Sequence, residues 1–136
     1  MSVACYGEGE EVCILSYGNG YYLSRQAEVE LAAKGIACRV VDLRWLAPLD
    51  EQGIIAHVSA CKNVLIVDEC RETGSISEAI MTLITENNLT SSERKIKRLC
   101  AKDSFIPLGK AAYQVLPSKQ EIIDLVFEMT SGEVPA

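Results

Sequence analysis

The chain has 136 residues, of which 49% are hydrophobic and 24% are charged, and its formal net charge is −6. This length fits one globular domain, and the composition excludes an intrinsically disordered chain. The negative charge disfavours non-specific binding to nucleic acids, which depends on clustered Lys and Arg, and it permits a basic protein partner.

The first part of the chain predicts alternating strands and helices. Residues 1–10 are expected to form a polar lead-in, and the apolar run Val12–Ser16 predicts a buried strand. A glycine-rich turn follows, and apolar residues at helical spacing predict a helix over residues 21–35 that stops at its final glycine. The β-branched stretch at residues 36–43 predicts a second strand.

The middle of the chain continues this alternation. Asp50 is placed to cap a helix over residues 51–61, and the apolar run at residues 63–68 predicts a third strand that is covered on both faces. Ser75 and Glu78 then form a capping-box pattern that predicts the start of another helix.

The last part predicts one more strand and one more helix. Residues 95–101 predict a fourth, weaker strand. Ser118 and Glu121 form a second capping-box pattern ahead of an amphipathic helix, and residues 131–136 are expected to fray.

This order of elements predicts a three-layer α/β/α domain over residues 11–130, with helices on both faces of a mostly parallel sheet. Ligands of such sheets usually lie outside the carboxyl ends of the strands. The loops at residues 17–20, 44–50 and 69–75 are therefore the places where a site is expected.

Two glycines after the first strand resemble part of a dinucleotide-binding fingerprint. Gly18 and Gly20 lie between a strand and a helix, and Asp42 stands near the end of the second strand, where an acid would bind a ribose. Leu23 takes the place of the third glycine, and a leucine there would push the helix away from the strand. We expect a plain strand-to-helix turn, with nucleotide binding as the alternative.

The loop after the third strand holds several reactive side chains. Cys70 lies beside Arg71, and a nearby cation favours a thiolate. A catalytic cysteine also needs a base, and the only histidine, His57, lies in a helical stretch. The acids Asp68, Glu69 and Glu72 also oppose a thiolate. We therefore predict no catalytic residue in this loop.

The same loop has a structural interpretation. Glu69 and Thr73 are expected to satisfy backbone groups at a strand-to-helix turn, Gly74 to supply an unusual dihedral angle, and Ser75 to cap the helix. These four residues, together with Arg71, are candidates for a structural or interface role.

Aromatic side chains flank the same strand ends, at Tyr17, Tyr21, Tyr22 and Trp45. They predict either an exposed patch that meets a protein partner or a part of the core, and the sequence leaves both open. Tyr17 and Trp45 are our aromatic interface candidates.

The six cysteines lie far apart in the sequence, without the closely spaced ligand pairs of a zinc site. We expect free thiols that pack as small apolar residues, and no metal site. No run of about 18 apolar residues predicts a membrane span, and the N-terminal stretch is unlike a secretory signal. The expected location is therefore the cytoplasm, or the mitochondrial matrix in a eukaryote.

The order of motifs is similar to that of a known family. The stretches EGEEVCILSYGNG, AAKGIACRVVDLRWLAPLD, VLIVDECRETGSISEAI and RLCAKDSFIPLGKAAYQVLPSKQEIID resemble the C-terminal domain of transketolase-type thiamine diphosphate enzymes. They look closest to the beta subunit of the decarboxylating component of 2-oxoacid dehydrogenases. The most specific parts are VDLRWLAPLD and the D-E-x-x-x-T-G turn, and the likeness covers residues 9–126.

The resemblance implies a five-stranded α/β/α sheet with one strand antiparallel to the others. Because the chain shows only four convincing strands, the fifth is expected near Pro107 or before the last helix. In this family, thiamine diphosphate and Mg²⁺ lie between two other domains, one of which binds the diphosphate and one the pyrimidine. The C-terminal domain helps to build the dimer interface and offers a docking surface to the small, basic binding domain of the acyltransferase.

Two departures from the family pattern matter. The family turn usually reads T-G-G, where this chain has Thr73, Gly74 and Ser75, and both cofactor-binding domains lie outside this sequence. The chain is therefore expected to be a fragment or a split gene product that alone neither binds the cofactor nor turns over substrate. Its expected partners are the alpha subunit, the pyrimidine-binding domain, a second copy of itself and the acyltransferase binding domain.

The reaction implied for the whole enzyme is oxidative decarboxylation of a 2-oxoacid, with transfer of the acyl group to a lipoyl arm. Two alternatives remain open. The chain is otherwise the C-terminal domain of a transketolase or a deoxyxylulose-phosphate synthase, or it is a free-standing protein-interaction module.

Overall fold

The computed structural model describes residues 2–131, which form one five-stranded sheet in the order β1-β3-β2-β4-β5. β1 runs antiparallel to β3, whereas β3, β2, β4 and β5 are mutually parallel. The strands are β1 (Ala4–Tyr6), β2 (Val12–Ser16), β3 (Cys38–Asp42), β4 (Asn63–Arg71) and β5 (Ile96–Ala101). The helices are α1 (Gly18–Ala33), α2 (Glu51–Ser59), α3 (Ile76–Glu86) and α4 (Lys119–Ser131), with a 3-10 helix η1 at Gly109–Gln114.

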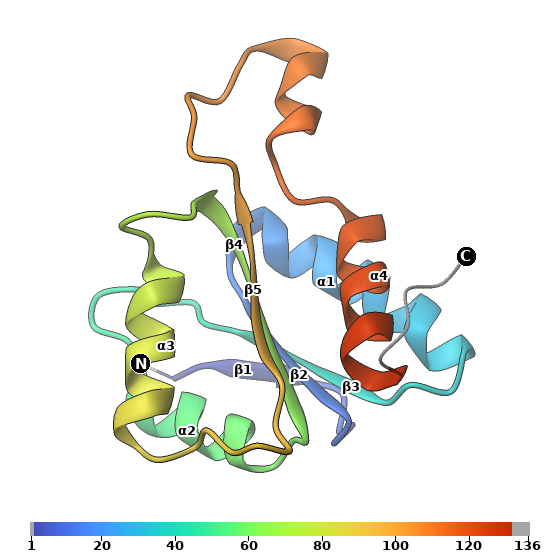
Figure 1. Ribbon diagram of the computed structural model, residues 1–136, viewed down its shortest axis with the longest axis vertical. Helices are drawn as coiled ribbons and strands as arrows, with labels where there is room; N and C mark the ends of the chain where they lie inside the picture. Colours follow the sequence, from blue (N-terminus) through green and yellow to red (C-terminus); the bar gives the residue numbers. More distant parts are fainter. Residues whose placement is uncertain (1, 132–136) are drawn as a thin grey trace.

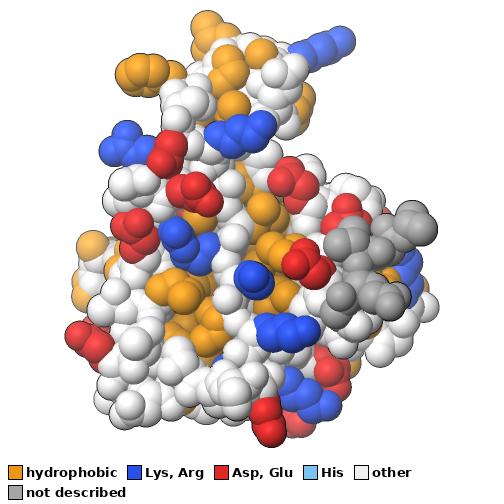
Figure 2. Space-filling view, viewed as in Figure 1, with side chains coloured by type: hydrophobic (Ala, Val, Ile, Leu, Met, Phe, Trp, Pro, Cys, Tyr) orange, Lys and Arg blue, Asp and Glu red, His pale blue; other side chains and the backbone are white. Residues whose placement is uncertain are grey.

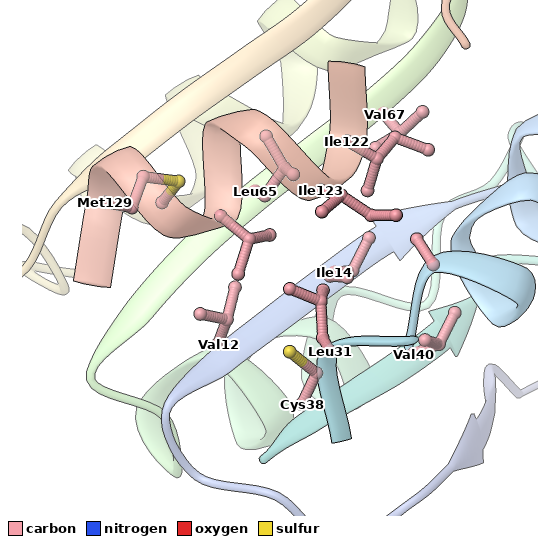
Figure 3. Packing of buried hydrophobic residues seen from close by; sticks show 12 residues of the cluster. Val12, Ile14, Leu31, Cys38, Val40, Leu65, Val67, Ile122, Ile123 and Met129 are labelled. Carbon is pink, nitrogen blue, oxygen red and sulfur yellow. The ribbon is translucent and has the colours of Figure 1, made fainter. Parts of the chain in front are cut away.

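The helices cover both faces of the sheet, with α1 and α4 on one side and α2 and α3 on the other (Figure 1). Every residue of β2 is buried, because alternate side chains enter the two cores. Figure 3 shows one of these cores, in which Ile14 of β2 lies among Leu31 of α1 and Ile123 of α4. The three-layer α/β/α prediction and the sheet with one antiparallel strand are thus confirmed.

The four strands expected from the sequence are present, but the expected position of the fifth was wrong. It is β1, at Ala4–Tyr6, inside the stretch that we expected to be a polar lead-in. β1 is a short strand at the edge of the sheet and none of its residues is fully buried, so it carries no apolar run that a sequence pattern would reveal. Gly9, in the loop after β1, packs so tightly that a Cβ would lie 2.3 Å from the carbonyl carbon of Ala37.

Two of the three predicted helix caps form. Asp50 Oδ1 accepts the backbone N–H of Gly53 at 3.0 Å, and Ser118 Oγ accepts that of Glu121 at 3.2 Å. α1 begins at Gly18, three residues before the predicted start. Of the predicted frayed tail, Ser131 ends α4, and residues 132–136 lie outside the described part of the chain.

The connection between β5 and α4 projects beyond the rest of the molecule (Figure 1). We call residues 102–118 the arm; it includes η1, and almost all of its side chains are exposed or only half-buried. The backbone N–H of Lys102 donates to the carbonyl of Val115 at 3.1 Å and so closes the base of the arm.

Candidate functional site

The carboxyl ends of β2, β3, β4 and β5 meet at one edge of the sheet, because these strands are parallel. The loops that were expected to hold a site, after residues 16, 43 and 68, all start there, and the arm projects from the same edge (Figure 1). We therefore describe this carboxyl edge as the candidate functional site.

Asp68 is the centre of the hydrogen bonds at this edge. Its carboxylate is fully buried and accepts the Tyr17 hydroxyl at 2.5 Å, the Cys70 backbone N–H at 2.9 Å and the Ser77 backbone N–H at 2.9 Å. Burial and the bond to Asp68 raise the pKa of Tyr17, so this side chain stays a phenol at neutral pH. These contacts tie the end of β4 to the start of α1 and to the first turn of α3.

The turn after β4 adopts the backbone conformation expected for Gly74, whose φ is +74°. Thr73 donates both its backbone N–H and its hydroxyl to Asp103, at 3.0 and 2.6 Å. These two bonds lower the pKa of Asp103, which thus stays ionised at neutral pH. Thr73 therefore braces the first residues of the arm, not the backbone of its own turn as we expected; the Thr73 carbonyl accepts Arg71 Nε at 3.1 Å.

The predicted cap of α3 by the Ser75 side chain was wrong. Ser75 does occupy the N-cap position, but its hydroxyl bonds to the Ser77 hydroxyl at 2.7 Å and makes no cap bond. The Glu78 carboxylate accepts the N–H of Gly74 at 2.9 Å. The backbone N–H of Ser77 has no partner within the helix and donates to the Asp68 carboxylate. The cap of α3 is therefore supplied by the preceding strand.

The predicted role of Glu69 was also wrong. Within residues 2–131, its Oε1 atom is buried and has no hydrogen-bond partner, so it does not brace the backbone there. Glu69 lines an open hollow of about 530 Å³ together with Tyr17, Cys70 and Lys102. A buried carboxylate oxygen without a donor is uncommon, and it makes this side chain a candidate for contact with something outside the described residues.

Cys70 and the histidine that could serve it as a base lie on different elements. Cys70 is exposed, and its sulfur accepts the Tyr17 hydroxyl at 3.4 Å. His57 lies on α2, where its Nδ1 atom accepts Arg39 Nη1 of β3 at 3.3 Å. The histidine on α2 and the cysteine at the end of β4 thus belong to different parts of the fold.

Of the two glycines after β2, Gly18 has a positive φ of +56° and Gly20 is required for packing. A Cβ on Gly20 would lie 2.5 Å from Ser16 Oγ, which itself donates to the Val67 carbonyl at 2.8 Å. Gly20 thus lets α1 approach β2 and β4, and Leu23 is half-buried against the core beside it. The Asp42 carboxylate accepts the backbone N–H of Arg44 at 3.2 Å, as a turn residue does.

The arm exposes large apolar side chains. Phe105 is 100% exposed, Leu108 95% and Tyr113 80%. Figure 2 shows the apolar side chains gathered on the arm at the top of the molecule. A hollow of about 690 Å³ lies at the base of the arm, lined by Phe105 and by residues of the turn after β4. Exposed aromatic and aliphatic clusters of this kind mark surfaces that another molecule covers.

Some of the aromatic candidates are half-buried within the fold, and others are exposed on its surface. Tyr17 is half-buried and bonded to Asp68, whereas Tyr22 and Trp45 are exposed. Tyr21 is half-buried, with its ring centroid 5.7 Å from that of Tyr6 on β1. Tyr21 also packs on Tyr22, with the ring centroids 5.4 Å apart, so the four aromatics include both half-buried and exposed side chains.

Sequence reasoning missed the residues that define this edge most clearly. Asp68 was treated only as a charge that opposes a thiolate, and Phe105 and Leu108 were not singled out. A signal for the arm was present: the stretch FIPLG places three large apolar residues around Pro107 and before Gly109, where a strand or helix is not expected to bury them.

Neither a metal-binding group nor a membrane-spanning helix is found in the described part of the chain. Among residues 2–131, no group of three or more His, Cys, Asp or Glu side chains is arranged to hold a metal ion. None of the helices found in the same range is long and apolar enough to cross a membrane.

Comparison with known proteins places these features in a family. The model of the transketolase C-terminal domain matches residues 3–122. The chain is 31% identical over 117 residues to the beta subunit of the pyruvate dehydrogenase E1 component from Staphylococcus aureus, and 34% identical over 118 residues to the 2-oxoisovalerate dehydrogenase subunit beta from Bacillus subtilis. These matches cover 86% and 84% of this chain but only 36% of each relative, so the chain spans about a third of their length.

Solved structures agree on the fold. A chain described as a split gene transketolase, inactive beta4 tetramer, superposes with a TM-score of 0.79 at 22% identity over 95% of this chain and 41% of that chain. A 2-oxoglutarate:ferredoxin oxidoreductase from Magnetococcus marinus superposes with a TM-score of 0.67 at 21% identity, over 96% of this chain and 20% of that chain. The chain belongs to the transketolase C-terminal domain family and is homologous to the beta subunits of 2-oxoacid dehydrogenases.

Proposed function

We propose that this chain is the C-terminal assembly domain of a thiamine diphosphate-dependent 2-oxoacid dehydrogenase, in the beta subunit of its decarboxylating component. Its task is to hold the enzyme together through the carboxyl edge and the arm. The observation that carries this proposal is the exposure of Phe105 and Leu108 on an arm whose base is closed by hydrogen bonds. A side chain of this size gains free energy when a partner covers it, at roughly 25 cal/mol per Å² of apolar surface.

The relatives support this assignment. The relatives at 31% and 34% identity are both named as beta subunits of 2-oxoacid dehydrogenases, and this chain corresponds to about a third of each. The remaining parts of such an enzyme supply the domains that bind the cofactor. The parent reaction is then oxidative decarboxylation of a 2-oxoacid with acyl transfer to a lipoyl arm.

The described residues do not fit magnesium diphosphate. Asp68 is the one fully buried acid among residues 2–131, and it already accepts three hydrogen bonds through its two oxygens. Asp103 is likewise held by Thr73. We therefore assign the cofactor and Mg²⁺ to the other domains of the enzyme and give this chain no step in the chemistry.

The proposed partners follow from the same surface. The arm and the loop at Arg71, Thr73 and Gly74 face outward together and line one hollow, so they are suited to meet the alpha subunit, the pyrimidine-binding domain or a second copy. Glu69 and Trp45 are further contact candidates at this edge. The net charge of −6 suits the basic binding domain of the acyltransferase. The proposed location is the cytoplasm, or the mitochondrial matrix of a eukaryote.

The experiment is co-expression of this chain with the polypeptides that carry the remaining domains, followed by measurement of the assembled mass by light scattering. Replacement of Phe105 and Leu108 by Ser should abolish assembly, while the free energy of unfolding of the chain alone changes by less than about 0.5 kcal/mol. Val29→Ser is the matched control, because Val29 is 64% exposed on α1, and it should leave assembly intact.

Two results contradict the proposal. One is assembly by the Phe105 and Leu108 double variant with unchanged affinity. The other is saturable binding of thiamine diphosphate and Mg²⁺ by the chain alone in a calorimetric titration, since that requires a cofactor site within this domain.

A further inference from the structure

The sheet has an open edge at β5. This strand is the last in the order of the sheet, and within residues 2–131 no further strand pairs with it. Figure 1 shows β5 in front of the other strands, with α3 and α4 to either side of it. The Lys95 carbonyl accepts the Val64 N–H at 2.9 Å, so alternate residues of β5, starting from Lys97, face β4. The backbone N–H and C=O groups of Ile96, Arg98 and Cys100 therefore point away from the sheet, as on any unpaired edge.

The sequence along this edge is strongly basic. Residues 94–102 hold five of the 13 Lys and Arg residues and no Asp or Glu, in a chain whose net charge is −6. The side chains of Lys95, Lys97 and Lys102 are exposed, and within residues 2–131 none of them forms an ion pair. Figure 2, seen from the same side, shows Lys and Arg side chains on this face with apolar side chains beside them. The open edge thus carries unpaired positive charge.

The two faces of β5 offer different side chains, because successive residues of a strand point to opposite sides of the sheet. Lys97 shares a face with Leu99, which is half-buried against the core beneath α1 and α4. Ile96 is on the other face, half-buried against the core beneath α2 and α3. Arg98 shares that face and donates to the Glu72 carbonyl at 2.9 Å. A strand added at this edge would therefore lie beside unpaired lysines on one face and beside an apolar side chain on the other.

We propose that β5 pairs with an extended acidic segment of a partner polypeptide, which joins the sheet as a further strand. The outward backbone groups of β5 bind the backbone of the segment. Acidic side chains at alternate positions of the segment meet Lys95 and Lys97, and the apolar side chains between them cover Ile96. β5 has six residues, which sets the length of the paired segment. This surface runs along the strand and is separate from the arm, so the inference does not depend on the proposed assembly function.

Other occupants fit this edge less well. Two β5 strands from two copies would bring Lys97 and Arg98 of both into one short ladder, where like charges opposite each other are destabilising. Lysines on an edge strand thus keep copies apart and admit a strand of opposite charge. A nucleic acid is disfavoured by the net charge of −6, and it would leave the outward backbone groups of β5 without a strand partner.

The first test measures binding by the full chain of a fluorescein-labelled peptide in which Glu and Val alternate. Fluorescence anisotropy should show saturable binding that weakens as salt is added, because salt screens exposed charges. A peptide with Lys in place of each Glu should bind at least about tenfold more weakly, since like charges would then face each other. A peptide of the same composition in which Glu and Val do not alternate should also bind more weakly.

Amide hydrogen exchange, followed by NMR, then shows whether the backbone of the edge takes part. The N–H groups of Ile96, Arg98 and Cys100 should exchange more slowly in the complex. Those of Lys97 and Leu99 already face β4 and should change little. Two further peptides carry N-methyl groups on every Glu or on every Val. Only one of these two sets of N–H groups faces β5 in a paired strand, so one peptide should lose binding and the other should keep it.

A pair of variants tests the charge of the edge. Lys97→Glu should lower the affinity for the alternating acidic peptide by at least about tenfold. Lys110→Glu is the matched control, because it makes the same change of charge at an exposed lysine of η1 and should leave the affinity unchanged. Both side chains are exposed, so both variants should fold.

Four outcomes overturn the proposal. One is an equal effect of the two variants on affinity, and another is an equal effect of the two N-methylated peptides. The third is slowed exchange of the Ile96 N–H when the chain alone is concentrated, which would assign the edge to a second copy. The fourth is tighter binding of a single-stranded oligonucleotide than of the acidic peptide. All four are measured on the chain without its assembly partners, so they leave the proposed function unaffected.

Discussion

The buried carboxylate of Asp68 accepts the backbone N–H of Ser77 at 2.9 Å, so a strand residue caps the helix that starts after the next turn. The first N–H groups of a helix have no partner within the helix, and they are usually capped by the residue directly before it. Here the cap comes from nine residues upstream. The arrangement fixes the turn between β4 and α3, from which the arm is braced through Thr73 and Asp103.

Replacement of Asp68 by Asn should lower the free energy of unfolding by about 2–4 kcal/mol, because one carboxamide oxygen cannot accept three donors and its NH₂ group would face one of them. Urea unfolding followed by circular dichroism measures this loss. Asp42→Asn is the control: Asp42 accepts only the N–H of Arg44, and its replacement should cost less than about 1 kcal/mol. Equal losses for the two variants would show that Asp68 does not act as a cap.

The parts of the fold that the sequence predicts are those with continuous burial. β2 and β4 are covered on both faces, so every residue of Val12–Ser16 is buried and the apolar run marks the strand. β1 has three residues at the sheet edge and, within residues 2–131, pairs only with β3. β3 begins at Cys38, which is 32 residues after Tyr6 at the end of β1. An edge strand of this length has no local signal, because its stability comes from a distant partner.

In the candidate site, too, local features are predicted from the sequence and long-range contacts are not. The positive φ of Gly74 follows from a local rule about turns, and that prediction is confirmed. The partners of Thr73 and Tyr17 are Asp103 and Asp68, which are 30 and 51 residues away. Hydrogen bonds between residues so far apart depend on how the loops meet in space. The spacing of residues along the chain does not predict such an arrangement.

The two capping-box patterns give a direct test of this difference. Ser118→Ala should cost about 1 kcal/mol of unfolding free energy, because Ser118 Oγ accepts the Glu121 N–H. Ser75→Ala should cost less than about 0.5 kcal/mol, because its hydroxyl bonds only to Ser77 Oγ and caps nothing. Denaturant titrations of both variants make the comparison, and a larger loss for Ser75→Ala would contradict the described cap.

The contact between Gly20 and Ser16 predicts that the effects of replacing these two residues on the free energy of unfolding are not additive. Gly20→Ala places a Cβ 2.5 Å from Ser16 Oγ, and the hydroxyl cannot move without losing its bond to the Val67 carbonyl. We expect Gly20→Ala to lower the free energy of unfolding by about 1–3 kcal/mol. In a Ser16→Ala background the new Cβ would have Val67 Cγ1 and the Val67 carbonyl oxygen as neighbours, both at 3.5 Å, which is an ordinary contact distance. The same Gly20→Ala change should then be neutral or stabilising, so additive losses in this double-mutant cycle would disprove the contact.

His57 is the only histidine of the chain, so its titration can be followed by NMR without assignment. Burial and the nearby Arg39 guanidinium lower the pKa of His57 from its usual 6.5, while Asp50 opposes the shift. Between the lowered value and 6.5 the unfolded chain binds more protons than the folded one. The free energy of unfolding should therefore fall as the pH drops below 6.5, and this decline should stop below the folded pKa.

Arg39→Gln should move the midpoint of the His57 titration upward, since it removes the cation that opposes a second positive charge. Lys62→Gln is the matched control: Lys62 is exposed and pairs with Glu11 at 2.7 Å, so its loss should leave the His57 midpoint unchanged. A wild-type midpoint at or above 6.5, or an equal response to both variants, would contradict the contact between Arg39 and His57.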